Sequence, residues 1–179
     1  DDKQLLMSEF LSANESYLHL FDLATKALTP INPQPGQKIA YGSATWSADG
    51  KGVYYTSDEN GEFQQLTYYD LSSKKKNVLT STLPWDVEEV EVSPNGKWLA
   101  FTANEDGLSK LHVLARGDVK ELALPAMPAG IISGLKFKPD GSALAFTMNT
   151  SQTPGEVYAL AMSNLQLQRW TFSEAGGLN

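Results

Sequence analysis

Two adjacent glutamates near a tryptophan, Glu88, Glu89 and Trp85, form the constellation with the clearest capacity for chemistry. Paired carboxylates can bind the ammonium terminus of a peptide through charge-assisted hydrogen bonds. The following residues Val90 and Val92 alternate with polar residues and lead into a Ser-Pro-Asn-Gly turn, so the pair lies where a β-strand begins. Exposed charge is common at such a position. The default interpretation is therefore a solvated strand end, and the functional alternative is that these three residues contact a peptide.

Two histidines, His19 and His112, are the available bases for a serine triad. Such a triad usually needs a Gly-x-Ser-x-Gly elbow beside an oxyanion hole, and the sequence contains none. The histidines fall at equivalent positions of repeated segments, which favours structural roles, and two are too few for a three-ligand metal site. The chain has no cysteine, which excludes thiolate nucleophiles and zinc–thiolate sites. We therefore expect no catalytic, metal-binding or cofactor-binding residue here.

Two acidic clusters, residues 58–62 and 104–107, and a run of three lysines, residues 74–76, are further candidate binding groups. A calcium loop needs alternating oxygen ligands followed by a bidentate glutamate at fixed spacing, and neither cluster has the full pattern. Residues of these types are typical of solvated turns. Three lysines in an acidic chain create no strong binding field, so we expect an exposed hairpin tip there.

Charge and composition narrow the possible partners. The 179 residues include 14 basic and 21 acidic ones, with a net charge of −7. Nucleic acids and anionic membranes both require a basic face, so this balance argues against either partner. No apolar run approaches the roughly 18 residues that cross a bilayer. Hydrophobic residues make up 41% of the chain, which is enough for a packed core.

Three turns of similar sequence recur at fixed spacing and position these candidates. They are Asp49-Gly50, Asn95-Gly96 and Asp140-Gly141, with glycines 46 and 45 residues apart. Glycine adopts positive φ without steric cost and Asp or Asn tolerates it, so each pair predicts a tight hairpin turn.

Short segments rich in aromatic and β-branched residues follow each turn and predict three further strands per unit. The second strands are predicted at 53–56, 98–102 and 143–147, the third at 66–69, 111–114 and 157–160, and the fourth at 77–80, 119–124 and 167–172. Four strands in roughly 45 residues, with no helical periodicity between them, are the signature of β-propeller blades.

The first unit is incomplete, because residues 2–8 align with the second strand of the next unit. We predict an all-β fold, a β-propeller fragment of about four blades of four antiparallel strands, whose first blade lacks its inner strand. The blades are expected at approximately 1–31, 38–82, 85–125 and 129–172. The residues after Phe172 include two glycines and make a poor closing strand, so we expect an open arc that self-associates through its uncovered blade faces.

The Ser-Pro-Asn/Asp-Gly-Lys turn at this spacing resembles the WD-like propeller repeat of TolB-type proteins and of the prolyl oligopeptidase and dipeptidyl-peptidase family of serine peptidases. The tail, residues 169–179, resembles the segment with which bacterial members of that peptidase family leave the last blade for their α/β-hydrolase domain. The resemblance implies a seven- or eight-bladed propeller that caps a hydrolase and admits peptides rather than folded proteins. It also implies that residues 173–179 are an exit linker, and it favours a periplasmic or secreted location.

The sequence contains no hydrolase domain, so the resemblance transfers no catalytic residue. In dipeptidyl-peptidases the paired glutamates that hold a substrate's amino terminus lie on a helical excursion, and Glu88 and Glu89 have no such insertion around them. We expect a non-catalytic propeller portion of a prolyl-oligopeptidase-like serine peptidase, which docks on its own hydrolase domain and restricts the access of peptide substrate. The alternative is a TolB-like propeller scaffold that binds another protein. A propeller lyase or glycosidase with a central metal is disfavoured by the lack of clustered histidines.

Overall fold

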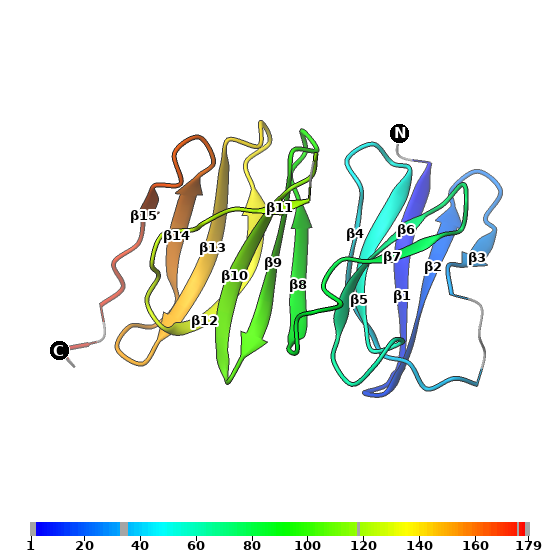
Figure 1. Cartoon of the computed structure of the whole chain (residues 1–179), viewed down its shortest axis with the longest axis horizontal. Helices are drawn as coiled ribbons and strands as arrows, with labels where there is room; N and C mark the ends of the chain where they lie inside the picture. The colour runs from blue at the N-terminus through cyan, green and yellow to red at the C-terminus, as the bar shows by residue number, and fades with distance from the viewer. Residues whose placement is uncertain (1–2, 33–35, 118, 175, 178–179) are drawn as a thin grey trace. The chain divides into compact units, whose positions relative to one another are not determined.

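A computed structural model describes residues 3–32, 36–117, 119–174 and 176–177. The parts of the predicted first blade and exit linker at residues 1–2, 175 and 178–179 lie outside these residues. All regular elements in the described part are β-strands (Figure 1). The chain divides into two compact units, Asp1–Asp86 and Val87–Asn179. In the described ranges, no helix is long and apolar enough to cross a membrane.

The first unit contains two sheets, each a meander of consecutive strands. The three-stranded sheet comprises β1 (Gln4–Ser12), β2 (Glu15–Asp22) and β3 (Leu28–Pro30). The four-stranded sheet comprises β4 (Tyr41–Trp46), β5 (Gly52–Ser57), β6 (Gln65–Asp70) and β7 (Lys76–Val78). The smaller sheet begins at the strand equivalent to β5, as predicted for a blade without its inner strand.

The second unit contains two four-stranded meanders. One comprises β8 (Asp86–Val92), which begins at the last residue of the first unit, β9 (Trp98–Glu105), β10 (Leu108–Ala115) and β11 (Lys120–Glu121). The other comprises β12 (Gly130–Phe137), β13 (Ala143–Thr150), β14 (Glu156–Ala161) and β15 (Leu167–Arg169). The all-β prediction is confirmed, although the outer strand β11 is much shorter than predicted.

In the recurring turns, glycine and the preceding Asp or Asn have different roles, whereas the prediction allowed both residues positive φ. Gly50, Gly96 and Gly141 have φ of 67°, 69° and 71°, the left-handed region that glycine favours. The preceding Asp or Asn residues do not share positive φ. Instead, each side chain accepts a hydrogen bond from the backbone N–H two residues later, over 3.2 Å from Lys51, 3.0 Å from Lys97 and 2.9 Å from Ser142. These Asx contacts stabilise the turn from the side chain.

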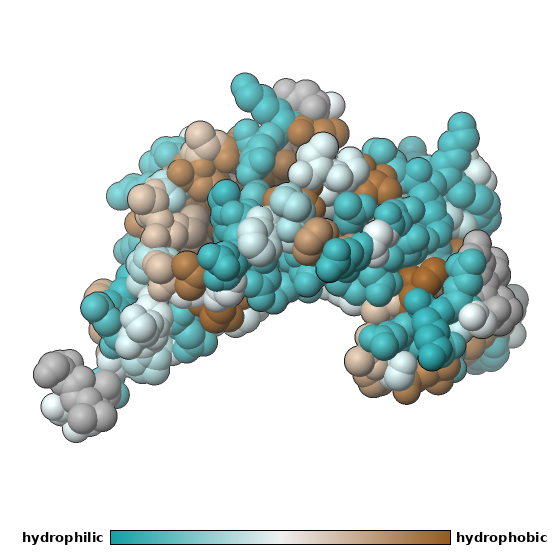
Figure 2. Space-filling view, turned by 60° about the horizontal axis from the view of Figure 1, so that its bottom comes forward, coloured by the Kyte–Doolittle hydropathy of each residue, from teal (hydrophilic) through white to brown (hydrophobic). Residues whose placement is uncertain are grey.

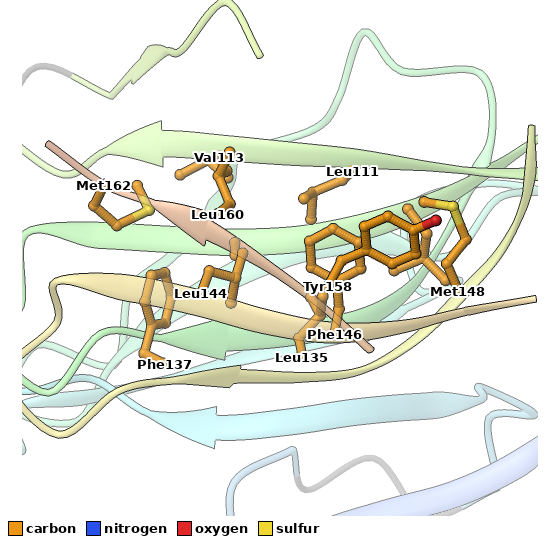
Figure 3. Close-up of a cluster of buried hydrophobic side chains, with 12 residues drawn as sticks. Leu111, Val113, Leu135, Phe137, Leu144, Phe146, Met148, Tyr158, Leu160 and Met162 are labelled. Atoms are coloured by element: carbon orange, nitrogen blue, oxygen red, sulfur yellow. The ribbon is translucent and has the colours of Figure 1, made fainter. Parts of the chain in front are cut away.

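The core of the second unit is built on one face of β13. Leu144, Phe146 and Met148 recur at every second residue and are completely or almost completely buried, because successive side chains of a strand point to opposite faces. Figure 3 shows them packed among side chains from β10, β12 and β14. The cluster joins two sheets into one packed unit.

The first unit has its own core between its two sheets. Leu18 and Leu20 of β2 pack in one cluster with Tyr41 of β4 and Tyr55 of β5. The two tyrosine rings meet edge to face, with centroids 5.6 Å apart, an arrangement that aromatic pairs prefer. Burial raises the pKa of Tyr55, so its hydroxyl remains protonated.

Candidate functional site

Contacts between the two sheets of the second unit repeat the sequence period. Glu89 of β8 contacts Gly134 of β12, Glu91 forms an ion pair with Lys136 over 3.0 Å, and the Asn95 amide donates to the Asp140 carbonyl over 3.0 Å. In each case the two residues are 45 positions apart. The period of the sequence is therefore also the register in which one sheet contacts the next.

Glu89 stabilises an irregularity in the neighbouring strand. The register of β12 against β13 shifts between Ser133 and Lys136, and Gly134 within this bulge has a φ of 67°. The Glu89 carboxylate accepts the N–H groups of Gly134 and Leu135 over 2.9 and 2.8 Å. A bulge interrupts the ladder and leaves N–H groups in need of partners. Glu89 supplies them and is thereby engaged within the fold.

Glu88 lies on the opposite face of β8, because successive residues of a strand alternate. Its side chain is exposed and accepts one hydrogen bond, over 3.2 Å, from the Asn104 amide. Trp85 is half-buried in the segment before β8 and belongs to the first unit. The two carboxylates thus do not point to one site, and Glu88 is the member of the pair whose side chain is exposed.

Both histidines are paired with glutamates. His19 Nε2 lies 2.9 Å from Glu9. His112 is buried between two carboxylates, with Nδ1 2.7 Å from Glu121 and Nε2 3.3 Å from Glu105. Across the described ranges, no three or more metal-ligating side chains of this kind gather into a site.

The expectation that both acidic clusters are solvated turns is wrong for two glutamates. The side chain of Glu59 is only 8% exposed, accepts a 2.7 Å hydrogen bond from the Tyr55 hydroxyl and pairs with Lys76. Lys76 is accordingly the first residue of β7 rather than part of a free hairpin tip. Glu105 ends β9, and only residues 106–107 form the turn, both with positive φ. Cross-strand partners hold these carboxylates in place.

The segment after the last strand is held by one buried carboxylate, which the sequence analysis did not single out. The fully buried side chain of Glu156 accepts the Thr171 hydroxyl over 2.5 Å and the Ser173 N–H over 2.6 Å. It also pairs with Arg169 over 3.0 Å. The hydrogen bond from Thr171, aided by Ser173 and Arg169, lowers the pKa of Glu156 to about 2. We call Glu156, Arg169, Thr171 and Ser173 the exit clamp.

Acid is expected to open the exit clamp. The folded pKa of Glu156, about 2, lies below its ordinary value of 4.5, so its contribution is complete above about pH 4.5 and is lost as the pH falls toward 2. We expect the Ser173 amide in Glu156→Gln at pH 7 to exchange its hydrogen about tenfold faster than in the wild type. Hydrogen exchange followed by NMR measures this rate. Equal rates in the two proteins would contradict the clamp.

Large apolar side chains are exposed at both ends of the described chain. On β1, Met7 is 44% and Phe10 75% exposed, and beyond β15, Trp170 is 60% and Phe172 76% exposed. The Arg169 guanidinium lies over the Phe172 ring at 4.6 Å. Figure 2 shows hydrophobic residues reaching the surface in separate patches on the face drawn. Exposed apolar patches of this kind are typical of surfaces that contact other polypeptide segments.

Comparison with known proteins locates the fold. No family model matches the sequence, and no curated protein matches it. Among solved structures, TolB from Acinetobacter baumannii superposes with a TM-score of 0.73 and 22% identity over 94% of this chain. A prolyl endopeptidase gives a TM-score of 0.74 with 17% identity over 94% of this chain. A puromycin-hydrolysing peptidase from Mycobacterium tuberculosis gives 0.73 with 14% identity over 93%.

The chain is a partial β-propeller. Its structural neighbours are TolB and prolyl endopeptidase propellers, so the resemblance noted in the sequence is confirmed at the level of fold. The chain spans 41% of the TolB chain, 24% of the prolyl endopeptidase chain and 26% of the mycobacterial peptidase chain. It thus supplies a propeller scaffold of the kind that these larger proteins contain.

Proposed function

We propose that this chain is a non-catalytic section of the propeller of a prolyl-oligopeptidase-like serine peptidase, where it docks on an α/β-hydrolase domain and restricts the access of peptides. The observation that carries the proposal is the difference between the share of this chain and the share of the prolyl endopeptidase that superpose. The fold extends over 94% of this chain but only 24% of the prolyl endopeptidase. In that enzyme the same architecture is one part of a larger peptidase, and we assign this chain the corresponding part.

The physical basis of this role is the stiffness of strands that are held in ladders and packed on a core. Antiparallel ladders and a buried core in each unit give little freedom to individual strands, so the blades of each unit are stiff enough to obstruct folded proteins. The first strand of a blade lines the central channel of a propeller. Glu88, exposed on the first strand β8, is the residue that we propose contacts the ammonium group of a passing peptide, with Trp85 as an apolar contact nearby in sequence.

A TolB-like scaffold that binds another protein is the second candidate. The observation in its favour is the 22% identity with TolB, which is higher than the 17% with the prolyl endopeptidase. In this case the blade surface itself is the functional part. Under either assignment we propose a periplasmic or secreted location, and contact between copies through the exposed apolar residues of β1 when no neighbouring blade covers them.

A serine-directed probe tests the first assignment. The chain of residues 1–179 is expected to remain unlabelled by a fluorophosphonate and to hydrolyse no prolyl peptide, because neither histidine is paired with a serine hydroxyl in the described residues. The product of the whole gene is expected to be labelled and to cleave such peptides. Labelling of the 179-residue chain would contradict the non-catalytic role, and an unlabelled whole product would favour the scaffold.

A further inference from the structure

The outermost hydrogen bonds of three sheets follow one pattern. The backbone N–H groups of Ile31, Leu79 and Trp170 each donate over 2.8 Å to a carbonyl of the third strand of a full blade. The acceptors are Leu18 of β2, Leu66 of β6 and Val157 of β14. In two of these sheets a threonine one residue further, Thr80 or Thr171, accepts the N–H of the same third-strand residue. Both backbone groups of Leu66 and Val157 are thereby satisfied at the outer edge of the sheet.

The remaining sheet breaks the pattern at Leu111 of β10. Leu111 is opposite Thr102, as Leu66 is opposite Thr56, so the two leucines are equivalent. The last backbone bond of the outer segment, however, reaches β10 two residues beyond Leu111, from the Leu122 N–H to the Val113 carbonyl over 2.9 Å. Within the described ranges, no backbone hydrogen bond joins the segment after Leu122 to the rest of β10.

The sequence explains this departure. Leu124 and Pro125 occupy the positions of Leu79 and Thr80. Proline has no N–H and no hydroxyl with which to cap the strand, and it restricts the backbone of the residue before it. Pro128 follows in the same segment. The chain between β11 and β12 therefore leaves the sheet (Figure 1), at the position where the outer segments of the other sheets still donate a backbone bond.

The freed edge presents backbone groups in a regular array. In an antiparallel ladder, the N–H and C=O of one residue point to the same side, and successive residues alternate. The Val113 carbonyl points to the outer edge, so the N–H and C=O groups of Leu111 and Ser109 point there too. Four outward groups on these two residues have no strand partner in the described part of the chain.

A cavity of about 420 Å³ lies along this edge. Its lining includes four consecutive residues of β10, Leu108 to Leu111, whereas the face of a strand would contribute only alternate residues. The opposite wall consists of the departing segment with Leu124 and Met127, and Ile132 of β12 adds a further apolar contact. The volume lies in the range of natural ligand pockets.

The charges at the cavity are mainly acidic. Glu105 and Glu121 both line it, with Lys110 as the counterpart of Glu105 over 3.2 Å. Glu121 contacts His112 through Oε1, and its side chain is 56% exposed. This leaves carboxylate surface at the rim for a cation, in a chain whose net charge is −7. An apolar wall with an acidic rim is complementary to a segment that alternates apolar and basic residues.

We propose that the outer edge of β10 is a binding site for an extended peptide, which adds a strand between β10 and the segment 122–129. The peptide takes the backbone bonds of Leu111, which the chain itself supplies to the equivalent residues of the other sheets, and those of Ser109 one ladder step further. Its apolar side chains contact Leu124 and Met127, and a basic side chain pairs with Glu121. Strand addition of this kind derives affinity from main-chain hydrogen bonds and specificity from alternate side chains. The five residues from Leu108 to His112 extend over roughly 17 Å, which suits a partner segment of about five residues.

The probe is an acetylated and amidated pentapeptide of sequence Val-Lys-Val-Lys-Val, titrated into the 179-residue chain and followed by NMR. We expect saturable binding with a dissociation constant below about 1 mM. The chemical-shift changes should be concentrated at the amides of Ser109 and Leu111. Ser109→Pro removes one outward N–H without removing a ladder bond to β9, a position where an edge strand tolerates proline. This variant is expected to bind about tenfold more weakly, whereas Ser109→Ala, which keeps the N–H, binds as the wild type does.

Two further probes separate the backbone and charge contributions. A pentapeptide with an N-methylated central valine should lose binding, and Val-Glu-Val-Glu-Val should bind more weakly than the basic peptide. Absence of saturable binding, or equal affinity for wild-type and Ser109→Pro proteins with unchanged unfolding midpoints, would overturn the proposal. Self-association that Ser109→Pro abolishes and the peptide does not displace would assign the edge to a second copy and would overturn it as well.

Discussion

Leu144→Ala is expected to lower the free energy of unfolding of the second unit by about 3 kcal/mol. Leu144 is 0% exposed and lies at the centre of the cluster that joins the two sheets of this unit. Removal of its buried methyl groups loses the free energy gained when those groups leave water. It also leaves a cavity, because β13 is fixed by ladders on both sides and cannot move to fill it. Urea unfolding followed by circular dichroism measures the loss.

Ile131→Ala in β12 is the matched control. Ile131 is 44% exposed and leaves the cluster intact, so its loss is expected to stay below about 1 kcal/mol. A similar cost for both variants would contradict the placement of Leu144 at the centre of a shared core. It would also remove the basis for treating the two sheets as packed blades.

Glu89→Ala is expected to destabilise the second unit by about 2 to 3 kcal/mol. The substitution leaves the N–H groups of Gly134 and Leu135 without the carboxylate that accepts both. These groups belong to a bulge that no ladder bond can satisfy, so the stabilising contribution of two charge-assisted hydrogen bonds is lost at one position. The unfolding midpoint in urea measures the effect.

Glu88→Ala provides the comparison on the same strand. Its exposed carboxylate accepts one bond from Asn104, and we expect a cost below about 0.5 kcal/mol. Equal destabilisation by the two variants would contradict the structural role of Glu89 and the exposed, dispensable position on which the proposed ligand contact of Glu88 rests. The pair therefore separates a structural carboxylate from one that is available for function.

Features that depend on local chemistry were predictable from the sequence. The Asp/Asn-Gly turns recur because a hairpin at each position needs positive φ, and Gly50, Gly96 and Gly141 all adopt it. Strands β5, β9 and β13 follow these turns as the aromatic and β-branched residues indicate. The incomplete first sheet followed from alignment of the chain's opening residues with a second strand.

Features that depend on side-chain contacts between strands or between sheets were not predictable. An exposed strand-end carboxylate was the default interpretation of Glu89, since nothing in one sequence shows that it lies against a bulge 45 residues later. Glu59 and Glu105 were expected in solvent because residues of these types are typical of turns, and the sequence does not show that Tyr55 and His112 lie within hydrogen-bond distance of them. Glu156 was missed for the same reason.

One signal in the sequence was available and unused. Thr80 and Thr171 stand at the same position of two repeats, and Pro125 stands at that position in a third. The hydroxyls cap a strand in the structure, and the proline accompanies an uncapped one. A substitution of proline for a capping residue within a repeat thus indicates where a sheet edge stays open.

The nucleotide sequence of the gene downstream of the codon for Asn179 tests the proposed role most directly. If the chain is a propeller section of a prolyl-oligopeptidase-like peptidase, the reading frame continues and encodes Gly-x-Ser-x-Gly about 100 to 150 residues further on, the spacing that suits an α/β-hydrolase elbow. A stop codon directly after Asn179 would contradict the peptidase assignment and leave the protein-binding scaffold in its place.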